Sequence, residues 1–161
     1  VIATFVFYWW HRARHEVPAL WRGLHQLHHS ASRMEALTAF YRHPVEVLGG
    51  ALLGSVLVFA VLGLSVEAGA VYSLLTAWVQ IFIHANVRTP YWLGWLVQRP
   101  EMHRLHHQRN HHRDNYADLP MWDWLFGTLH NPRTEIAACG FEADKEARLS
   151  DMLKGKDVHL D

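Results

Sequence analysis

The sequence has little cysteine and no surplus of charge of either sign. Cys139 is the only cysteine among 161 residues, which excludes an internal disulfide and any cysteine-rich zinc module. The 15 Lys and Arg residues balance 15 Asp and Glu residues, so the basic excess that marks nucleic-acid binders is absent. We therefore expect no nucleic-acid partner, and the redox compartment stays open.

Two chemical signatures are also missing. No Glu is followed three residues later by His, which is the pair that soluble carboxylate-rich diiron bundles use. No flavin, haem or nucleotide fingerprint occurs either. A redox reaction in this protein would therefore need electrons from an external partner.

Histidine is abundant instead, with 14 residues. Eight of them form three clusters: His11 and His15; His25, His28 and His29; His103, His106 and His107. Side chains three and four residues apart on a helix share a face, so the spacing predicts that each cluster points all its imidazoles at one spot. Neutral imidazole is a good ligand for iron, zinc and copper. Eight or nine imidazoles are too many for one tetrahedral zinc or one haem, which predicts two metal ions.

Long apolar runs separate the last cluster from the first two. Residues 47–64 are 18 positions without a charge, and residues 68–83 are 16 more. Each run is close to the length that crosses roughly 30 Å of hydrocarbon, so residues 47–83 are predicted to form a transmembrane hairpin. A soluble helical bundle with an unusually apolar central pair stays open as the alternative.

Residues 1–10 are expected to be the end of another transmembrane helix whose start is missing, so the chain is expected to be truncated at its N-terminus. Its aromatic residues Tyr8, Trp9 and Trp10 are predicted to lie at the membrane interface. Arginines flank the hairpin on both sides, and its turn carries only Glu67. The positive-inside rule then places both flanks and all three histidine clusters in the cytoplasm.

The predicted fold is an all-α integral membrane helical bundle with a cytoplasmic cap of His-bearing helices. We expect a single membrane domain over residues 1–161, in which residues 84–135 form the cytoplasmic metal-site region and residues 136–161 a cytoplasmic tail. Residues 110–132 are expected to be irregular. Residues 142–153 have the pattern of a short amphipathic helix.

Proline and glycine punctuate these elements. Pro18, Pro44 and Pro100 each fit the first turn of a helix, where the missing N–H costs nothing. Gly155 fits the end of the last helix. The second and third histidine clusters are predicted to lie within helices that begin at such prolines.

The histidine pattern resembles the fatty acid hydroxylase and sterol desaturase superfamily of membrane diiron oxygenases, over about residues 5–130. Further segments carry the same resemblance: Arg42-x-Pro44-x-Glu46 preceded by His43, Gln80-Ile-Phe-Ile-His84-Ala-Asn86, Asn115-Tyr116, and Trp122-Asp123-Trp-Leu-Phe126-Gly127-Thr128. Ala117 departs from the Gly that often follows Asn-Tyr in this family, which affects the shape of the loop and not its chemistry.

The resemblance implies a ligand set, a cofactor and a reaction. The expected iron ligands and catalytic residues are His11, His15, His25, His28, His29, His84, His103, His106 and His107, with His112 as a further metal ligand. Two iron ions would activate O₂, and zinc would substitute on purification because all-nitrogen sites bind zinc more tightly. The substrate would be a membrane lipid such as a sterol or fatty acyl chain, which is hydroxylated or desaturated. Electrons would come from NAD(P)H through a reductase and a cytochrome or ferredoxin.

Other histidines and the loop acids are assigned lesser roles. His43 is expected to be structural or to orient a ligand, His111 to touch the site less than His112, and His130 and His159 to be bystanders. Four side chains in the loop could hydrogen-bond the ligand N–H groups, although acidic residues in a loop are usually only solvated: Asp114, Asn115, Asp118 and Asp123. A membrane metal-binding or transport protein with a His-rich zinc or iron site is the alternative function, and a haem-binding membrane anchor is less favoured because no histidines pair in mid-span.

Overall fold

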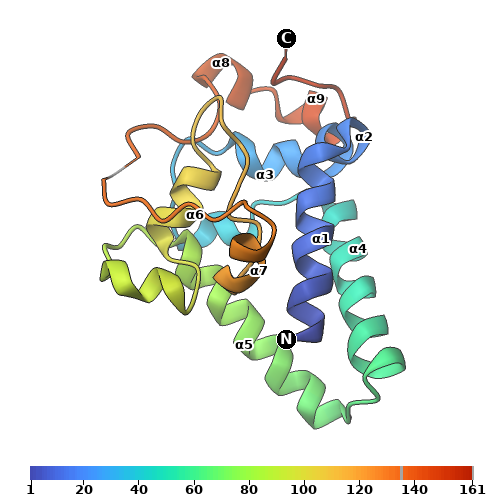
Figure 1. Cartoon of the computed structure of the whole chain (residues 1–161). Coiled ribbons are helices and arrows are strands. Elements are labelled where there is room, and N and C mark those ends of the chain that lie inside the picture. The colour runs from blue at the N-terminus through green and yellow to red at the C-terminus, as the bar shows by residue number, and fades with distance from the viewer. Residues whose placement is uncertain (135, 161) are drawn as a thin grey trace.

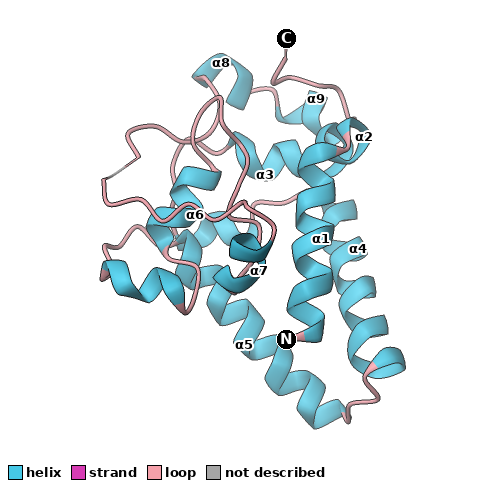
Figure 2. Ribbon diagram, viewed as in Figure 1, coloured by secondary structure: helices cyan, strands magenta, loops and turns pink. Residues whose placement is uncertain are grey.

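The regular elements of the chain are all helices, joined by long loops, as a computed structural model that describes residues 1–134 and 136–160 shows. Its long helices are α1 (Ile2–Glu16), α4 (Pro44–Ser55) and α5 (Val66–His84), which lie side by side or cross in the lower part of Figure 1. Of the shorter helices, some lie around and above the upper end of α1, while α7 lies beside its middle (Figure 1). No strand is found in the described residues, which confirms the all-α prediction (Figure 2).

The hairpin is formed by α4 and α5. A π-helical segment, η3 (Val56–Val61), continues α4, and Gly63 then turns the chain with a positive φ of 61°. Ser65 caps α5, because its Oγ accepts a hydrogen bond from the Ala68 N–H at 3.3 Å. Gly69 allows the two arms to approach, since a β-carbon there would lie 2.8 Å from the ring of Phe59.

Both arms are long and apolar enough to cross a membrane. Such stretches run over Pro44–Val61 and Val66–His84, and only 17% and 11% of them are buried inside the protein. The core helix of a soluble protein would be mostly buried, so the exposure of these apolar side chains favours a membrane environment. The chain thus has two candidate membrane-spanning helices where the sequence predicts a hairpin.

Proline begins the helices as predicted. Pro18 starts α2 (Pro18–Leu20), Pro44 starts α4, and Pro100 starts α6 (Pro100–His106). The chain continues from α2 without a break into a π-helical segment, η1 (Trp21–His25), and then into α3 (Gln26–Ser30). Two 3₁₀ segments, η2 (Ala36–Phe40) and η4 (Tyr91–Trp95), connect the larger elements.

Two predictions about the C-terminal third are wrong in detail. Residues 110–132 are not wholly irregular, because α7 (Pro120–Leu125) lies within them. Six residues are too few for a periodic apolar pattern, and Pro120 was the only available signal. The predicted helix at 142–153 is two helices, α8 (Ala143–Glu146) and α9 (Leu149–Leu153), because Arg148 leaves the helical conformation with a ψ of 41°.

The C-terminal segment packs back onto the η1–α3 stretch. Five buried side chains form this core: Trp21, Leu27, Phe141, Met152 and Val158. Gln26 fastens the two parts, since its side chain donates to the Lys156 carbonyl and accepts from the Val158 N–H at 3.2 Å. The segment therefore covers the helix that carries the second histidine cluster.

The expectation that Tyr8 lies at a membrane interface is wrong. Tyr8 is fully buried, its ring stacks on Phe126 at 5.2 Å, and its hydroxyl lies 3.2 Å from Thr128 Oγ1. The loop around α7 covers this side of α1, which the local sequence of α1 does not reveal. Trp9 packs against the same Phe126 ring, at 4.9 Å, but is 40% exposed.

Candidate metal centre

Four stretches of the chain bring their histidines together in the upper half of the molecule. These stretches are the end of α1, the η1–α3 stretch, the last residue of α5, and α6 with the residue that follows it. All nine histidines expected as catalytic ligands lie there, and seven of them are at most 2% exposed. Residues far apart in the sequence thus form one buried cluster of imidazoles.

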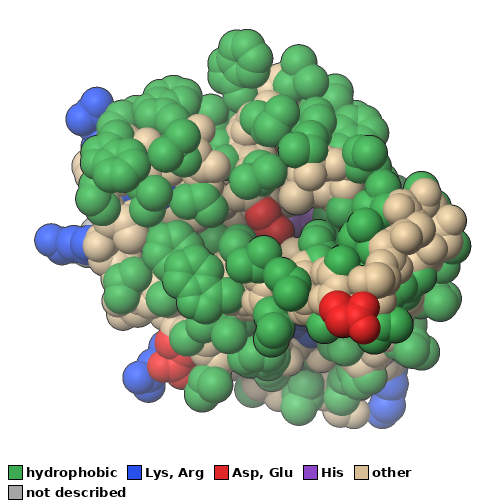
Figure 3. Space-filling model, turned by 90° about the horizontal axis from the view of Figure 1, so that it is seen from below, with side chains coloured by type: hydrophobic (Ala, Val, Ile, Leu, Met, Phe, Trp, Pro, Cys, Tyr) green, Lys and Arg blue, Asp and Glu red, His purple; other side chains and the backbone are tan. Residues whose placement is uncertain are grey.

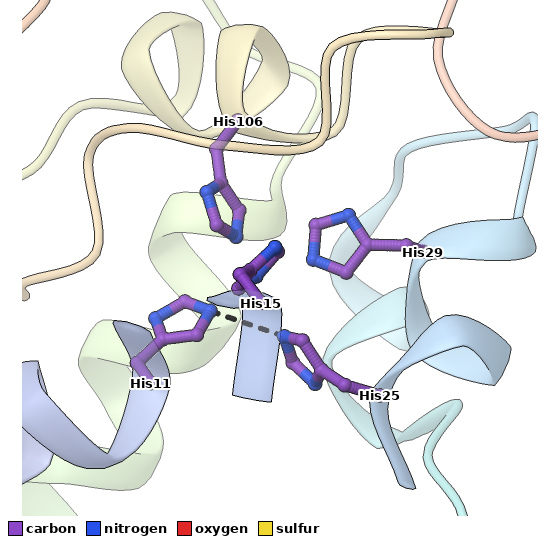
Figure 4. A group of neighbouring side chains, drawn as sticks. All are labelled: His11, His15, His25, His29 and His106. Carbon is purple, nitrogen blue, oxygen red and sulfur yellow. Dashed lines mark hydrogen bonds between the residues drawn. The ribbon is translucent and has the colours of Figure 1, made fainter. Parts of the chain in front are cut away.

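The nine imidazoles divide into two groups. The five-histidine group consists of His11, His15, His25, His29 and His106, and the four-histidine group of His28, His84, His103 and His107. Within each group all the ligand nitrogens lie within 4.8 Å of one another. The ligands of one ion with metal–nitrogen bonds of about 2.1 Å lie at most about 4.2 Å apart, so both groups are near the size of a metal site. Figure 4 shows the rings of the five-histidine group around a common centre.

The prediction that each cluster aims all its imidazoles at one spot is wrong for two clusters. His28 and His29 are adjacent, yet they belong to different groups, and so do His106 and His107. Neighbouring residues on a helix differ by about 100° in direction, so one cluster serves two centres. Only pairs four residues apart share a group, as His11 and His15, His25 and His29, and His103 and His107 do.

Hydrogen bonds fix the tautomers in the four-histidine group. His84 Nδ1 lies 2.7 Å from the Gln80 carbonyl oxygen, and His28 Nδ1 lies 3.2 Å from the Tyr41 carbonyl oxygen. A carbonyl only accepts, so each Nδ1 carries a hydrogen and each neutral ring has a bare Nε2. These two Nε2 atoms lie 3.2 Å apart. Two lone pairs at that distance repel, and a cation bound by both nitrogens removes the conflict.

The same conflict occurs in the five-histidine group. His11 Nδ1 donates to the Tyr116 carbonyl at 2.7 Å. His25 Nδ1 lies 2.9 Å from the Glu46 carboxylate and 3.2 Å from the Arg14 guanidinium, and the shorter contact, to an acceptor, places the hydrogen on Nδ1. Their bare Nε2 atoms are 3.1 Å apart. Burial lowers the pKa of both His11 and His25 well below the ordinary imidazole value, so a proton is a poor bridge. A metal ion fits this donor set.

Further nitrogens in the five-histidine group face inward without partners. His15 Nδ1 donates to the His112 carbonyl at 2.7 Å, and His106 Nδ1 donates to the Asp114 carbonyl at 2.6 Å. The Nε2 atoms of His15, His29 and His106 are buried and have no hydrogen-bond partner in the described residues. Buried polar atoms are normally satisfied, so these orphaned nitrogens also fit metal ligation.

Glu46 and Arg14 hold His25 from outside the group, a role that sequence reasoning missed. The Glu46 carboxylate is 2% exposed and accepts from both His25 and the Arg14 guanidinium. Such a carboxylate orients a ligating imidazole and raises its basicity. The available signal was a lone acid in the first turn of an otherwise apolar helix, next to Pro44.

The side chains of Asp118 and Asp123 hydrogen-bond to groups other than the cluster imidazoles. The Asp123 carboxylate accepts from the Tyr116 and Ala117 N–H groups, each at 2.8 Å, and Asp118 accepts from Gln80. These side chains make no hydrogen bond to a cluster imidazole in the described residues, so they do not orient a ligand directly. Ala117 has no positive φ, as its non-glycine identity suggested.

Asp114 and Asn115 differ from each other. Asp114 serves His106 through its backbone carbonyl, while its carboxylate lies 3.0 Å from His111 Nε2. The Asn115 side-chain amide donates to backbone carbonyls, one of them that of His130 at 2.8 Å. Both residues have positive φ values, 65° and 49°, which Asp and Asn tolerate better than most.

The remaining predicted histidines lie at the edge or outside. His112 is 7% exposed and its Nδ1 is 3.2 Å from His29 Nδ1, so it lies against the five-histidine group without belonging to either group. His43 is structural, because its Nδ1 accepts from the Val45 N–H at the start of α4. His159 packs its ring against His112 at 5.0 Å.

A cavity of about 620 Å³ leads to both groups between α1, α4 and α5. Its upper end is lined by His11, His25, His28 and His103, and its lower end by apolar side chains such as Phe59. Figure 3 looks at the molecule from below, where apolar side chains surround a hollow in which acidic and histidine side chains are visible. The imidazoles are thus reached from the apolar end of the protein.

The fold and the site place this protein in a class of helical proteins in which two groups of histidines lie beside an apolar cavity. The profile of the fatty acid hydroxylase family matches residues 1–128, and the chain belongs to that family.

Known relatives act on lipids. The chain is 35% identical to ornithine lipid hydroxylase OlsE of Rhizobium tropici over 137 residues, which are 82% of this chain and 40% of that protein. It is 34% identical to human alkylglycerol monooxygenase over 136 residues, 82% of this chain and 30% of that protein. It is 29% identical to a putative Delta(7)-sterol-C5(6)-desaturase of Arabidopsis thaliana, over 84% of this chain and 48% of that protein. The chain therefore spans less than half the length of these relatives. No solved structure matches it.

Proposed function

We propose that this protein carries out O₂-dependent hydroxylation or desaturation of a membrane lipid at two iron ions, one in each histidine group. The observation that supports this most is the pairing of bare imidazole nitrogens about 3 Å apart, once in each group. The relatives, which are lipid hydroxylases and desaturases, support the reaction class. Bound iron would supply the redox chemistry that activates O₂ and oxidises an unactivated C–H bond, which redox-inert zinc would not supply.

The protein's own residues position the ligands and the substrate. Glu46 keeps the hydrogen of His25 on Nδ1, so that Nε2 stays free to ligate. The lipid chain lies in the cavity between α1, α4 and α5, where Phe7 and Phe59 provide apolar walls. The position of each C–H bond relative to the imidazole groups then decides between alcohol and alkene.

The proposal includes the membrane organisation predicted from the sequence. The hairpin spans the bilayer, the first residues of α1 enter it, and the arginine-rich flanks hold the metal centre and the C-terminal segment on the cytoplasmic side. Electrons come from NAD(P)H through an external reductase and a cytochrome or ferredoxin. A metal transporter would place ligands along a path near the bilayer midplane, whereas His84 lies at the end of its helix.

The test is anaerobic reconstitution with two equivalents of Fe²⁺ in lipid nanodiscs, followed by O₂ and a chemical reductant in the presence of a total membrane lipid extract. We expect hydroxylated or desaturated lipid, detected by mass spectrometry, with ¹⁸O from ¹⁸O₂ in any alcohol. Zinc-loaded protein is the matched control and should give no product. An iron-loaded, reduced protein that oxidises no lipid in the extract would contradict the proposal.

A further inference from the structure

Three polar side chains form a chain across the apolar cavity. Arg42 donates to Gln80 Oε1 at 2.6 Å, and Gln80 Nε2 donates to Asp118 Oδ1 at 2.8 Å. All three line the cavity. The arginine can only donate, so it fixes the amide orientation and turns the Gln80 NH₂ toward Asp118. We call Arg42, Gln80 and Asp118 the polar strip.

Asp118 has acceptor capacity left over. Its second oxygen, Oδ2, has no hydrogen-bond partner among the described residues, and it is not among the fully enclosed atoms that lack partners. Burial raises the pKa of Asp118 to about 6, so the carboxylate is mainly ionised at neutral pH and acts as an acceptor only. A ligand at this point must bring a hydrogen-bond donor.

The charged side chains that line the cavity balance one another. Its charged lining residues are two arginines and two acids, Arg14, Arg42, Glu46 and Asp118. Glu46 is already paired with Arg14, and Gln80 links Asp118 to Arg42. A carboxylate head group beside Asp118 would meet a like charge, whereas a neutral hydroxyl loses little if it is hydrogen-bonded.

The polar strip lies close to the four-histidine group. Gln80 precedes His84 by one helical turn, about 5.4 Å, and its carbonyl accepts from His84 Nδ1. The apolar part of the cavity extends the other way along the helices, past Tyr72 toward Phe59. A polar group held by the strip therefore lies near the metal centre, with its hydrocarbon directed away.

We propose that the Asp118 carboxylate, oriented by Gln80, accepts a hydrogen bond from the hydroxyl of an uncharged lipid alcohol. The substrate class is thus a neutral lipid with a hydroxyl close to the carbon that is oxidised. The strip would set both the head-group preference and the carbon that is oxidised. The position of oxidation rests on the proposed function, whereas the binding of the alcohol does not. The binding itself needs no turnover.

The test compares three probes with the same chain length: hexadecan-1-ol, palmitate and hexadecane. Binding to the intact protein in nanodiscs is measured by equilibrium dialysis without O₂ or reductant. We expect the wild type to bind the alcohol about tenfold or more tightly than the alkane, as one hydrogen bond to a charged acceptor allows, and more tightly than palmitate. Asp118→Asn should bring the alcohol-to-alkane ratio to within about threefold of one. Asp151→Asn, which removes a carboxylate of α9 far from the cavity lining, is the matched control and should retain the wild-type ratio.

The outcomes separate the two proposals. If the wild-type protein does not prefer the alcohol, or prefers palmitate, the proposal for the polar strip is wrong. This measurement uses no variant, so it does not depend on whether a variant folds. Unchanged alkane affinity in Asp118→Asn shows an intact cavity, so an unchanged alcohol preference there also overturns it. Selective alcohol binding without any oxidation by the iron-loaded protein would support the role of the polar strip and contradict the proposed function. With turnover, oxidation of hexadecan-1-ol should fall within the first few carbons from the hydroxyl, and oxidation near the methyl end contradicts the strip.

Discussion

The two histidine groups differ in how their imidazoles are held. In the five-histidine group every Nδ1 has a partner: a backbone carbonyl for three rings, the Glu46 carboxylate for His25 and the His112 ring for His29. In the four-histidine group only His28 and His84 have one, while the Nδ1 atoms of His103 and His107 are buried without a partner in the described residues. All five rings of the first group are therefore held by a hydrogen bond at Nδ1, whereas only two of the four rings of the second group are.

The difference follows from where the rings originate. The five-histidine group takes His11 and His15 from the C-terminal end of α1 and its other residues from short helices, whereas His84 is the last residue of a candidate membrane-spanning helix. A displacement of α5 moves a ligand of the four-histidine group directly. We infer that the five-histidine group is the tighter metal site, and that the four-histidine group responds to what occupies the cavity.

The largest effect is expected from removing one ligand of each group. His106→Ala and His107→Ala change two adjacent residues at the end of α6, but each removes a ligand from a different group. Each should lower bound metal from two ions to about one and reduce lipid oxidation by more than about a hundredfold, since even the loss of an outer partner costs about 10–100-fold. Metal analysis of the purified variants, with His130→Ala as the exposed control, measures this. Loss of both metals from both variants would show one coupled site instead of two.

A second prediction concerns the buried, neutral imidazoles that both groups contain. Burial lowers the pKa of His29 in one group and of His103 and His107 in the other well below 6.5. The unfolded chain takes up protons near pH 6.5 and the metal-free folded chain does not. Its free energy of unfolding is therefore fully present above pH 6.5 and falls as the pH drops, by about 1.4 kcal/mol per pH unit for each such imidazole.

Denaturant unfolding of the metal-free protein in detergent at pH 7.5, 6.0 and 5.0 measures this slope. Metal-loaded protein should begin to lose stability at lower pH, because protons must then displace the ion. A metal-free protein whose stability stays constant from pH 7.5 to 5.0 would mean that the imidazoles are solvated, contrary to their burial.

Glu46→Gln probes the anchoring of the five-histidine group alone. The amide can still accept from His25, but it lacks the charge that strengthens this bond and pairs with Arg14. We expect metal affinity of the five-histidine group to fall about 10–100-fold, with the four-histidine group unchanged. Chelator competition resolves the two sites, and Glu67→Gln, at the exposed hairpin turn, is the control. Equal weakening of both sites would instead indicate a general loss of stability from the unpaired Arg14.

The sequence was informative where the signal is local. Apolar runs, helix-starting prolines and the spacing of the clusters predicted the hairpin, the start of α6 and eight of the nine histidines that the structure gathers, and the family resemblance added His84. It failed where a contact between distant segments decides the result. The burial of Tyr8 depends on Phe126, and the role of Glu46 depends on a ring 21 residues away. The division into two groups follows from helix geometry, but which ring faces which centre depends on how four helical stretches meet.

The smallest effect is expected at His112, which the sequence predicted as a metal ligand. Its ring touches His29 Nδ1 from outside the five-histidine group, and His159 and Phe141 pack against it at 5.0 and 5.3 Å. His112→Asn should therefore keep two metal ions and lower lipid oxidation less than about tenfold, because only the orientation of His29 is disturbed. Metal content and product formation, measured beside His107→Ala, decide between the roles. If His112→Asn loses one ion as His107→Ala does, His112 moves into the five-histidine group once metal is bound, and the anchoring of that group is less complete than the ring contacts imply.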